Sequence, residues 1–177
     1  CISTTANLSC SVTGGSGSYL YEWSPAVGLS DFDIPNPVVT ATFLGDVVYT
    51  VKVTDLVSGC QSATATVTIT TVPLPNIYTL SGNAFYCFGS TEGATLTLSD
   101  SETDVLYQLM SGATAVGAPR LGTGDTLQWK NNFDGSYFVE AVRNATPACE
   151  RTMTGVINIT ANPEIVMTLN QVTGTDC

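Results

Sequence analysis

Residues 47–54 read Val-Val-Tyr-Thr-Val-Lys-Val-Thr, and this stretch decides the class of fold. Residues of one parity are large and apolar, which is the two-residue period of a β-strand with one face in a core. Residues 63–70, Ala-Thr-Ala-Thr-Val-Thr-Ile-Thr, repeat the pattern with threonine on the outer face. Glycine and proline separate such segments, and we find no convincing amphipathic helix. The pattern predicts an all-β chain made of antiparallel β-sandwiches.

Landmarks recur in the same order one domain length further along the chain. Cys60 recurs as Cys149, 89 residues later. Cys1, Cys87 and Cys177 form a second set of equivalent positions, each ahead of the second strand of its repeat. The period is that of a whole sandwich domain and is too long for a solenoid turn. The sequence therefore predicts tandem domains.

The repeat divides the chain into three parts. Residues 1–72 form the first domain, whose first strand we expect to be missing, and residues 73–162 form the second. Residues 163–177 are expected to be the first strand of a following repeat. Residues 73–75, Pro-Leu-Pro, make a short linker. Because proline fixes φ and cannot join a ladder, this linker favours an extended rod.

The composition argues against several classes of function. The 177 residues include no histidine, and 15 acidic residues against five basic ones give a net charge of -10. Histidine is the side chain that titrates near neutral pH without tuning, so its absence argues against acid–base catalysis. Phosphate binding needs a basic stripe, so nucleic acid is not an expected partner. No apolar run approaches the roughly 20 residues of a membrane-spanning helix. We expect no enzyme activity, no cofactor and no membrane span.

Two acidic stretches are candidates for a calcium site. Asp31 and Asp33 flank a phenylalanine, and Asp100, Glu102 and Asp104 alternate in a loop. Calcium needs several oxygen ligands in one place, and neither stretch matches the calcium-loop pattern. Solvated turns explain them better, the cysteine spacing is not that of a zinc site, and the scattered acids do not suggest a glycosidase. The sequence predicts no metal site.

The first domain contains a set of distinctive segments: Thr-Gly-Gly-Ser-Gly-Ser-Tyr-Leu-Tyr-Glu-Trp-Ser-Pro-Ala-Val-Gly-Leu-Ser at 13–30, Asn-Pro at 36–37, Tyr-Thr-Val-Lys-Val-Thr-Asp at 49–55 and Gly-Cys at 59–60. Through these segments it resembles the PKD-like module that is common in Bacteroidota surface proteins. The second domain resembles a companion immunoglobulin-like repeat, through Tyr-Cys at 86–87, Val-Leu-Tyr-Gln-Leu at 105–109, Gly-Ser-Tyr at 135–137 and Cys149. The resemblance implies a large adhesin or gliding-motility filament at the cell surface, exported by type IX secretion.

Four residues are expected to build the core of the first domain. Trp23 should lie between the two sheets, and Tyr49 should begin the strand paired with it. Leu8, Cys10 and Val12 share one parity, so Cys10 should face the core opposite Val51. Trp129 precedes an expected turn at residues 131–132 and receives no role.

An extracellular context implies that the six cysteines form bridges. The repeat predicts Cys1–Cys60 and Cys87–Cys149 within domains, Cys10 as a buried free thiol and a partner for Cys177 outside the sequence. One difficulty leaves an alternative open. The second and sixth strands run parallel, so the cysteines of one domain lie at opposite ends unless the first sits partway along its strand. The alternative is a staple between repeats, Cys1–Cys149.

These observations predict a stalk or spacer segment of a large extracellular adhesin or filament, used for adhesion or gliding. Its partners would be neighbouring repeats, and its surface or glycan ligand is not specified. One alternative is a subunit of a self-assembling fibre, in which the tail from residue 163 completes a neighbour's sandwich. Another is a spacer module of a secreted hydrolase. Thr126, in Asp-Thr-Leu at residues 125–127, matches a short signal for bacterial O-glycosylation.

Overall fold

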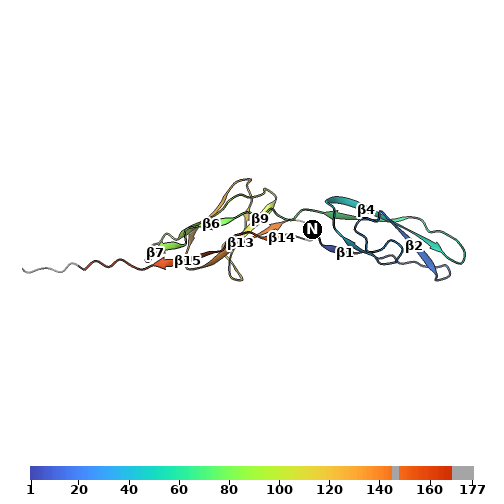
Figure 1. Cartoon of the computed structure of the whole chain (residues 1–177), viewed down its shortest axis with the longest axis horizontal. Helices are drawn as coiled ribbons and strands as arrows, with labels where there is room; N and C mark the ends of the chain where they lie inside the picture. Colours follow the sequence, from blue (N-terminus) through green and yellow to red (C-terminus); the bar gives the residue numbers. More distant parts are fainter. Residues whose placement is uncertain (145–147, 169–177) are drawn as a thin grey trace, which may run out of the picture. The chain divides into compact units, whose positions relative to one another are not determined.

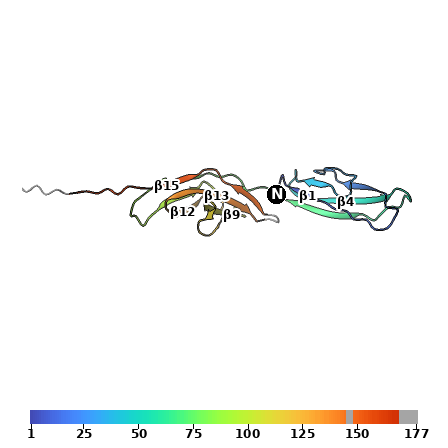
Figure 2. The same cartoon turned by 90° about the horizontal axis from the view of Figure 1, so that it is seen from below.

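A computed structural model describes residues 1–144 and 148–168, and in these ranges the chain forms strands and loops alone (Figure 1, Figure 2). The all-β prediction is therefore confirmed. The described residues contain no helix that could cross a bilayer. Contacts divide the chain into two units, each described by itself below. The first is Cys1–Pro75 with Arg143–Glu150, and the second is Asn76–Val142 with the chain from Arg151 onward.

The first unit contains two antiparallel sheets. One pairs β1 with β3, and the other has the order β2-β4-β5, in which β4 lies between its neighbours. The long central strand results from the alternating sequence that also predicts it. The strands are β1 (Thr5–Asn7), β2 (Tyr19–Ser24), β3 (Val38–Thr40), β4 (Gly45–Asp55) and β5 (Ala65–Thr71).

One apolar cluster fills the space between these two sheets. Tyr49, Val51 and Val53 project from one face of β4, and Trp23 of β2 is directly opposite Val51 in the register. Val39 contributes from the other sheet, so both sheets bury a face against the same cluster. Removing these side chains from water drives the packing of the two sheets, at about 25 cal/mol per Å² of apolar surface. The unit is sandwich-like.

The edge strand β5 differs from the simple alternation expected from its sequence. Residues Ala65–Thr68 are exposed on both faces, Val67 among them at 38%. Only Ile69 and Thr71 turn toward the interior of the unit. The reason is that β5 is the last strand of its sheet, so the small opposite sheet covers only its C-terminal half. Tyr49 lies in the middle of β4 and does not begin it.

The second unit also contains two sheets, one of three strands and one of seven. The smaller sheet has the order β12-β8-β6, and the larger has the path β10-β9-β13-β15-β7, with β11 beside β9 and β14 beside β13. The strands are β6 (Leu80–Gly82), β7 (Phe85–Cys87), β8 (Ala94–Leu98), β9 (Val105–Ser111), β10 (Thr114–Ala115), β11 (Arg120–Leu121), β12 (Leu127–Asn132), β13 (Gly135–Arg143), β14 (Cys149–Thr152) and β15 (Ile157–Asn162).

A larger apolar cluster joins the two sheets of the second unit. Leu96, Leu98 and Trp129 come from the smaller sheet, and Tyr107 and Val139 come from the larger one. At the edge of the larger sheet, β7 runs parallel to β15 (Figure 1). This unit is also sandwich-like. The strand expected from residue 163 onward falls mostly on residues 169–177, outside the described residues, and residues 163–168 contain no strand.

Candidate functional site

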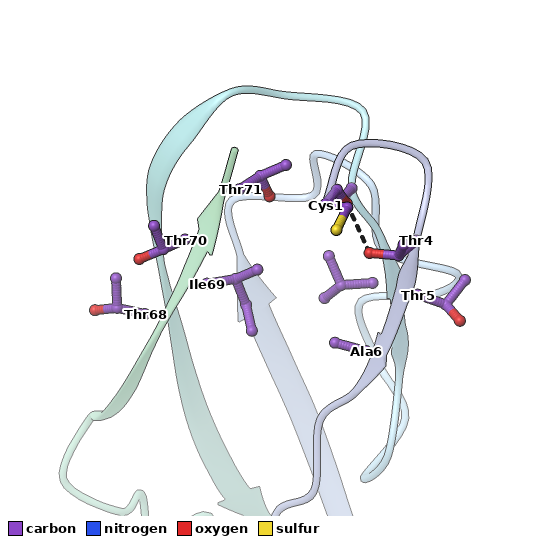
Figure 3. A pocket seen from close by; sticks show the side chains of 10 residues that line it. Cys1, Thr4, Thr5, Ala6, Thr68, Ile69, Thr70 and Thr71 are labelled. Atoms are coloured by element: carbon purple, nitrogen blue, oxygen red, sulfur yellow. Dashed lines mark hydrogen bonds between the residues drawn. The ribbon is translucent and has the colours of Figure 1, made fainter. Parts of the chain in front are cut away.

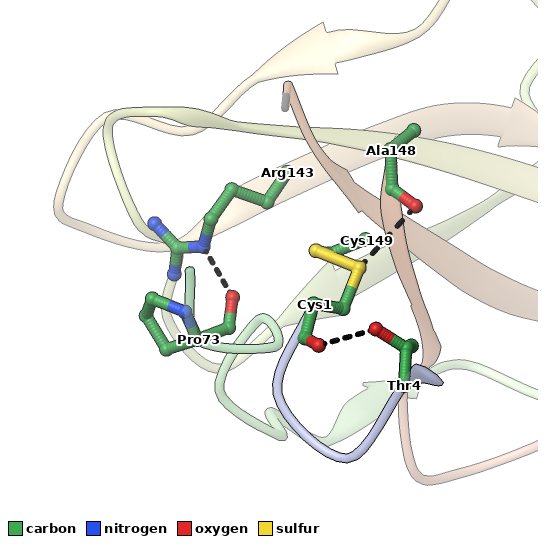
Figure 4. Close-up of a disulfide and its surroundings, with 6 residues drawn as sticks. All are labelled: Cys1, Thr4, Pro73, Arg143, Ala148 and Cys149. Carbon is green, nitrogen blue, oxygen red and sulfur yellow. Dashed lines mark hydrogen bonds between the residues drawn. A yellow bond between two sulfur atoms is a disulfide. The ribbon is translucent and has the colours of Figure 1, made fainter. Parts of the chain in front are cut away.

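A disulfide joins Cys1 to Cys149, with their Cα atoms 5.5 Å apart (Figure 4). The Thr4 hydroxyl donates a 2.6 Å hydrogen bond to the carbonyl oxygen of Cys1, which fixes the turn that carries this cysteine. The Cys1 sulfur lies 3.5 Å from the carbonyl oxygen of Ala148. Beside the bridge, Arg143 Nε donates to the carbonyl oxygen of Pro73 at 3.0 Å. By contacts, both bridged cysteines belong to the first unit, although Cys149 is also the first residue of β14, which pairs with β13.

Cys1 and Cys87 occupy equivalent backbone positions, and we call them the lead cysteines. The amide after Cys1, that of Ile2, donates to the carbonyl of Val72 just beyond β5 at 3.0 Å. The amide after Cys87, that of Phe88, donates to the carbonyl of Asn162 at the end of β15 at 3.1 Å. Each lead cysteine carbonyl also accepts a bond from the amide three residues on. The sequence repeat is thus a repeat of hydrogen bonding.

Cys60 and Cys149 are equivalent in the sequence repeat, each in the hairpin that follows a long strand, and we call them the hairpin cysteines. The carbonyl of Cys60 accepts a 2.9 Å bond from the amide of Asp55, the last residue of β4. In the second repeat the amide of Met153 donates to the carbonyl of Val139 at 2.8 Å. Continuing that antiparallel register brings Cys149 opposite Arg143, the last residue of β13.

The structure corrects the two bridges predicted within domains. Cys60 and Cys87 are free thiols, so neither Cys1–Cys60 nor Cys87–Cys149 forms. The physical reason is strand length. Cys1 lies where β4 begins, because Gly45 pairs with the end of β5, whereas Cys60 bonds to the last residue of β4. Eleven residues of β4 at about 3.3 Å each separate the two cysteines by roughly 30 Å, and a bridge needs Cα atoms within about 7 Å. The alternative pair, Cys1–Cys149, is the one that the structure contains.

The free thiols differ in exposure. Cys60 and Cys87 are exposed, whereas Cys10 is half-buried and packs against the core cluster of the first unit. Cys10 lines a small cavity together with Trp23 and with Val51, the residue predicted to lie opposite it. Trp23, Val51 and Tyr49 are all buried, and the Tyr49 hydroxyl donates to the carbonyl oxygen of Val27. Burial raises the pKa of Tyr49.

A groove of about 330 Å³ lies beside the bridged cysteine in the first unit (Figure 3). One wall is the turn and strand from Cys1 to Ala6, and the other is the end of β5 from Thr68 to Thr71. Threonine side chains provide hydroxyl groups around it. In the second unit the corresponding strand, β15, is not at the edge of its sheet, because β7 pairs with it. The groove therefore flanks an edge that, among the described residues, carries no such strand in the first unit.

Asp55 is a buried carboxylate that the sequence reading did not single out. It accepts hydrogen bonds from the amides of Ser58, Ser16 and Val57 and from the hydroxyl of Ser16. These bonds hold the pKa of Asp55 far below its usual range, the amides of Ser58 and Ser16 contributing most. Gly15 packs so closely that a Cβ there would meet the Asp55 carboxylate at 2.5 Å, at a φ of +74°. Asp55 thus joins the glycine-rich loop to the hairpin that carries Cys60.

The acidic calcium candidates do not form a metal-binding group. Within the described residues, no cluster of three or more histidine, cysteine or acidic side chains could hold a metal. Asp31 and Asp33 share a hydrogen bond that lowers the pKa of Asp31 and raises that of Asp33. The Asp100 carboxylate accepts a hydrogen bond from the backbone amide of Ser101, and the Glu102 carboxylate accepts one from the backbone amide of Asn76. Both carboxylates therefore bind backbone amides.

Trp129 is buried in the core of the second unit, at 4% exposure. The Arg120 guanidinium lies 5.5 Å from the centre of its ring, within the range of a cation–π contact. Thr126, the O-glycosylation candidate, lies nearby in an exposed turn, where its amide donates to the Asp125 carboxylate at 2.7 Å. Asn132 is buried, and its side-chain amide donates to the carbonyls of Ala94 and Trp129. The expected turn at residues 131–132 is a bulge at the end of β12.

Comparison with known proteins adds no family assignment. No protein-family model matches the chain, and no curated protein matches it.

Proposed function

We propose that this chain is a structural repeat segment of a large extracellular adhesin or cell-surface filament, in which it acts as a stalk or spacer. The observation that carries the proposal is the Cys1–Cys149 bridge, which links the lead cysteine of one sequence repeat to the hairpin cysteine of the next. Such a bridge adds a covalent cross-link between successive repeats of the sequence. A cross-link of this kind suits a protein that must resist unfolding, and it requires an oxidising compartment.

Two further observations support the proposal. The repeated hydrogen bonds around the lead cysteines support tandem domains of one kind. The resemblance of residues 13–30 and 49–60 to PKD-like modules, and of the second repeat to an immunoglobulin-like companion, supports a surface adhesin of the Bacteroidota type. On this proposal the partners are the neighbouring repeats, and export uses type IX secretion.

Antibodies raised against the purified chain test the proposal. On intact cells that make the parent protein, immunogold labelling should lie at the cell surface, and deletion of the gene should reduce attachment or gliding. Antibody against a cytoplasmic protein is the matched control for cell integrity. Labelling found only after the cells are opened would reject the extracellular proposal, and normal attachment and gliding in the deletion strain would reject the adhesin role.

The groove beside β5 favours a second candidate, a subunit of a self-assembling fibre. A strand added there would continue the sheet by main-chain hydrogen bonds, as β7 does beside β15 in the second unit. The tail from residue 163 is the proposed donor. Light scattering should then show concentration-dependent assembly of the full chain and none for a chain ending at Asn162. Equal scattering by both chains would reject strand exchange by the tail.

A further inference from the structure

We propose that Cys60 and Cys87 each form a further bridge of the Cys1–Cys149 kind, made with a cysteine of a neighbouring sandwich repeat. Cys87 is a lead cysteine that would take the hairpin cysteine of a following repeat. Cys60 is a hairpin cysteine that would take the lead cysteine of a preceding one. The neighbouring repeat belongs either to a longer chain or to a second copy of this chain, in which case Cys87 of one copy joins Cys60 of another. The inference extends the proposed stalk function to a continuous series of covalent links.

The first line of evidence is that the structure already contains one bridge between these two classes of cysteine. Cys1 is a lead cysteine and Cys149 is a hairpin cysteine, and they are bonded to each other. The backbone bonds around Cys87 reproduce those around Cys1, to the end of the adjacent strand and to the third residue on. The position that forms the bridge in one repeat therefore has the same local geometry in the other.

The second line of evidence concerns burial. Cys149, which is bonded, has no exposed surface, whereas Cys60 at the equivalent hairpin position is exposed. Cys87 is exposed as well, at the end of β7. Structural cysteines without a bridge are among the most buried residue types, so two exposed thiols at bridge-forming positions call for partners. The half-buried Cys10, which packs against a core cluster, shows the ordinary behaviour of an unbridged cysteine.

The third line of evidence is exclusion by distance. Cys60 cannot reach the lead cysteine of its own repeat, because the length of β4 lies between them. Cys87 is separated in the same way from Cys149 by the nine residues of β13. A pairing between repeats is the one that the Cys1–Cys149 bridge already realises.

The chemistry requires a two-electron oxidant. Two thiols lose two protons and two electrons as the sulfur–sulfur bond forms, and a low-molecular-weight disulfide such as oxidised glutathione accepts them and becomes two thiols. Exchange proceeds through a mixed disulfide on one of the two cysteines, which the second thiolate then attacks. Exposure of both sulfurs permits each step.

Mixing two single variants tests the pairing rule between copies. In a Cys10→Ala, Cys177→Ala background, purified chains carrying Cys60→Ser or Cys87→Ser are incubated with oxidised glutathione, alone and together. The mixture should give a covalent dimer whose linked peptides contain Cys60 and Cys87, and each variant alone should stay monomeric. Recovery of the Cys1–Cys149 peptide in every sample serves as the check on folding.

A head-to-tail fusion tests the pairing within one chain. Residues 1–176 are followed directly by a second full chain, so that the second Cys1 takes the place of Cys177. The second Cys60 then follows the first Cys87 at one residue more than the 148 that separate Cys1 from Cys149. A Cys87–Cys60 peptide within the monomeric fusion should appear under the same oxidant and be lost when the first copy carries Cys87→Ser.

The mixing experiment and the fusion experiment, the two arms of the test, together show whether the partner cysteine belongs to a neighbouring repeat or to a second copy. A link in the fusion alone assigns the partner to a neighbouring repeat, and a link in both arms extends it to a second copy. Absence of the link from both arms overturns the proposal, as does a predominance of Cys60–Cys60 or Cys87–Cys87 products. Because these readouts concern purified protein, failure of the link is distinguishable from failure of the surface function, which cell labelling reports.

Discussion

At the scale of single residues, Asp55 is the side chain that holds one end of the first unit together. Its carboxylate accepts hydrogen bonds from the loop at residue 16 and from the hairpin at residues 57 and 58, so one side chain holds both segments together. The local sequence gives no sign of this role, because a final Asp in a strand is compatible with a solvated turn. Only the fold brings the amide of Ser16 to it, from 39 residues away.

The depressed pKa of Asp55 predicts a loss of stability in acid. A group whose pKa is lower in the folded state contributes stability that is present above its unfolded pKa, about 3.9, and is lost as the pH falls through the folded value. Urea midpoints should therefore fall as the pH is lowered from about 5 toward 2. Asp55→Asn should lower the midpoint at pH 7 and flatten this acid slope. An unchanged slope in the variant would assign the acid sensitivity to other carboxylates.

Trp23 gives a second prediction at this scale. It is 6% exposed, and its indole donates to the carbonyl of Ile34 at 2.9 Å. Trp23→Ala should lower the free energy of unfolding by about 3–5 kcal/mol, because it leaves a cavity and an unpaired carbonyl. Val48→Ala is the matched control, since Val48 is 51% exposed on the outer face of β4 and should change stability by under about 0.5 kcal/mol. A similar cost at both positions would contradict the assigned core.

At the scale of strands, alternation predicted what faces inward wherever a strand is covered. Tyr49, Val51 and Val53 are buried because β4 lies between two strands and beneath a second sheet. The same pattern overestimated burial in β5, since a sequence does not say which strand ends a sheet. The bulge at Asn132 could not be predicted from the sequence either, because the side-chain amide of Asn132 donates to the carbonyl of Ala94, which is 38 residues away.

The cysteine pairs show a further limit of prediction at this scale. The repeat identified the equivalent positions, and strand direction raised the correct objection to pairing within a domain. The alternation predicts only residues 47–54, whereas β4 runs from Gly45 to Asp55, and this full length places Cys1 and Cys60 too far apart for a bridge. The pairing of the cysteines therefore follows from the three-dimensional structure and not from the order of the cysteines in the sequence.

Removal of the bridge gives the prediction that belongs to this scale. Cys1 and Cys149 are 148 residues apart in sequence, so the bridge closes a long loop in the unfolded chain. Cys149→Ser should lower stability by up to about 5 kcal/mol on the loop-entropy model. Cys60→Ser, at the equivalent but unbridged position, should have little effect on the denaturation midpoint of the monomer. Equal effects of the two substitutions would show that the bridge does not stabilise the fold.

At the scale of the whole molecule, the repeat in the sequence coincides with a repeat of backbone positions at the lead cysteines. Cys1 and Cys87 recur with matching hydrogen bonds, although the side chains around them differ. The exposed pair, Cys60 and Cys87, could not be foreseen, since exposure at a cysteine depends on which partner is present.

The bridge between Cys1 and Cys149 also determines how the chain transmits tension. A pull applied at the two ends passes through the sulfur–sulfur bond and leaves the intervening residues without load. Single-molecule stretching of the oxidised chain should therefore show no release of that segment, and a reducing agent should add roughly 500 Å of contour length at about 3.5 Å per residue. Release of this length from the oxidised chain would contradict the claim that the bridge keeps the load off these residues. Under load, the oxidised chain acts as a tether of fixed length, and the further length that it can release depends on whether the bridge is reduced.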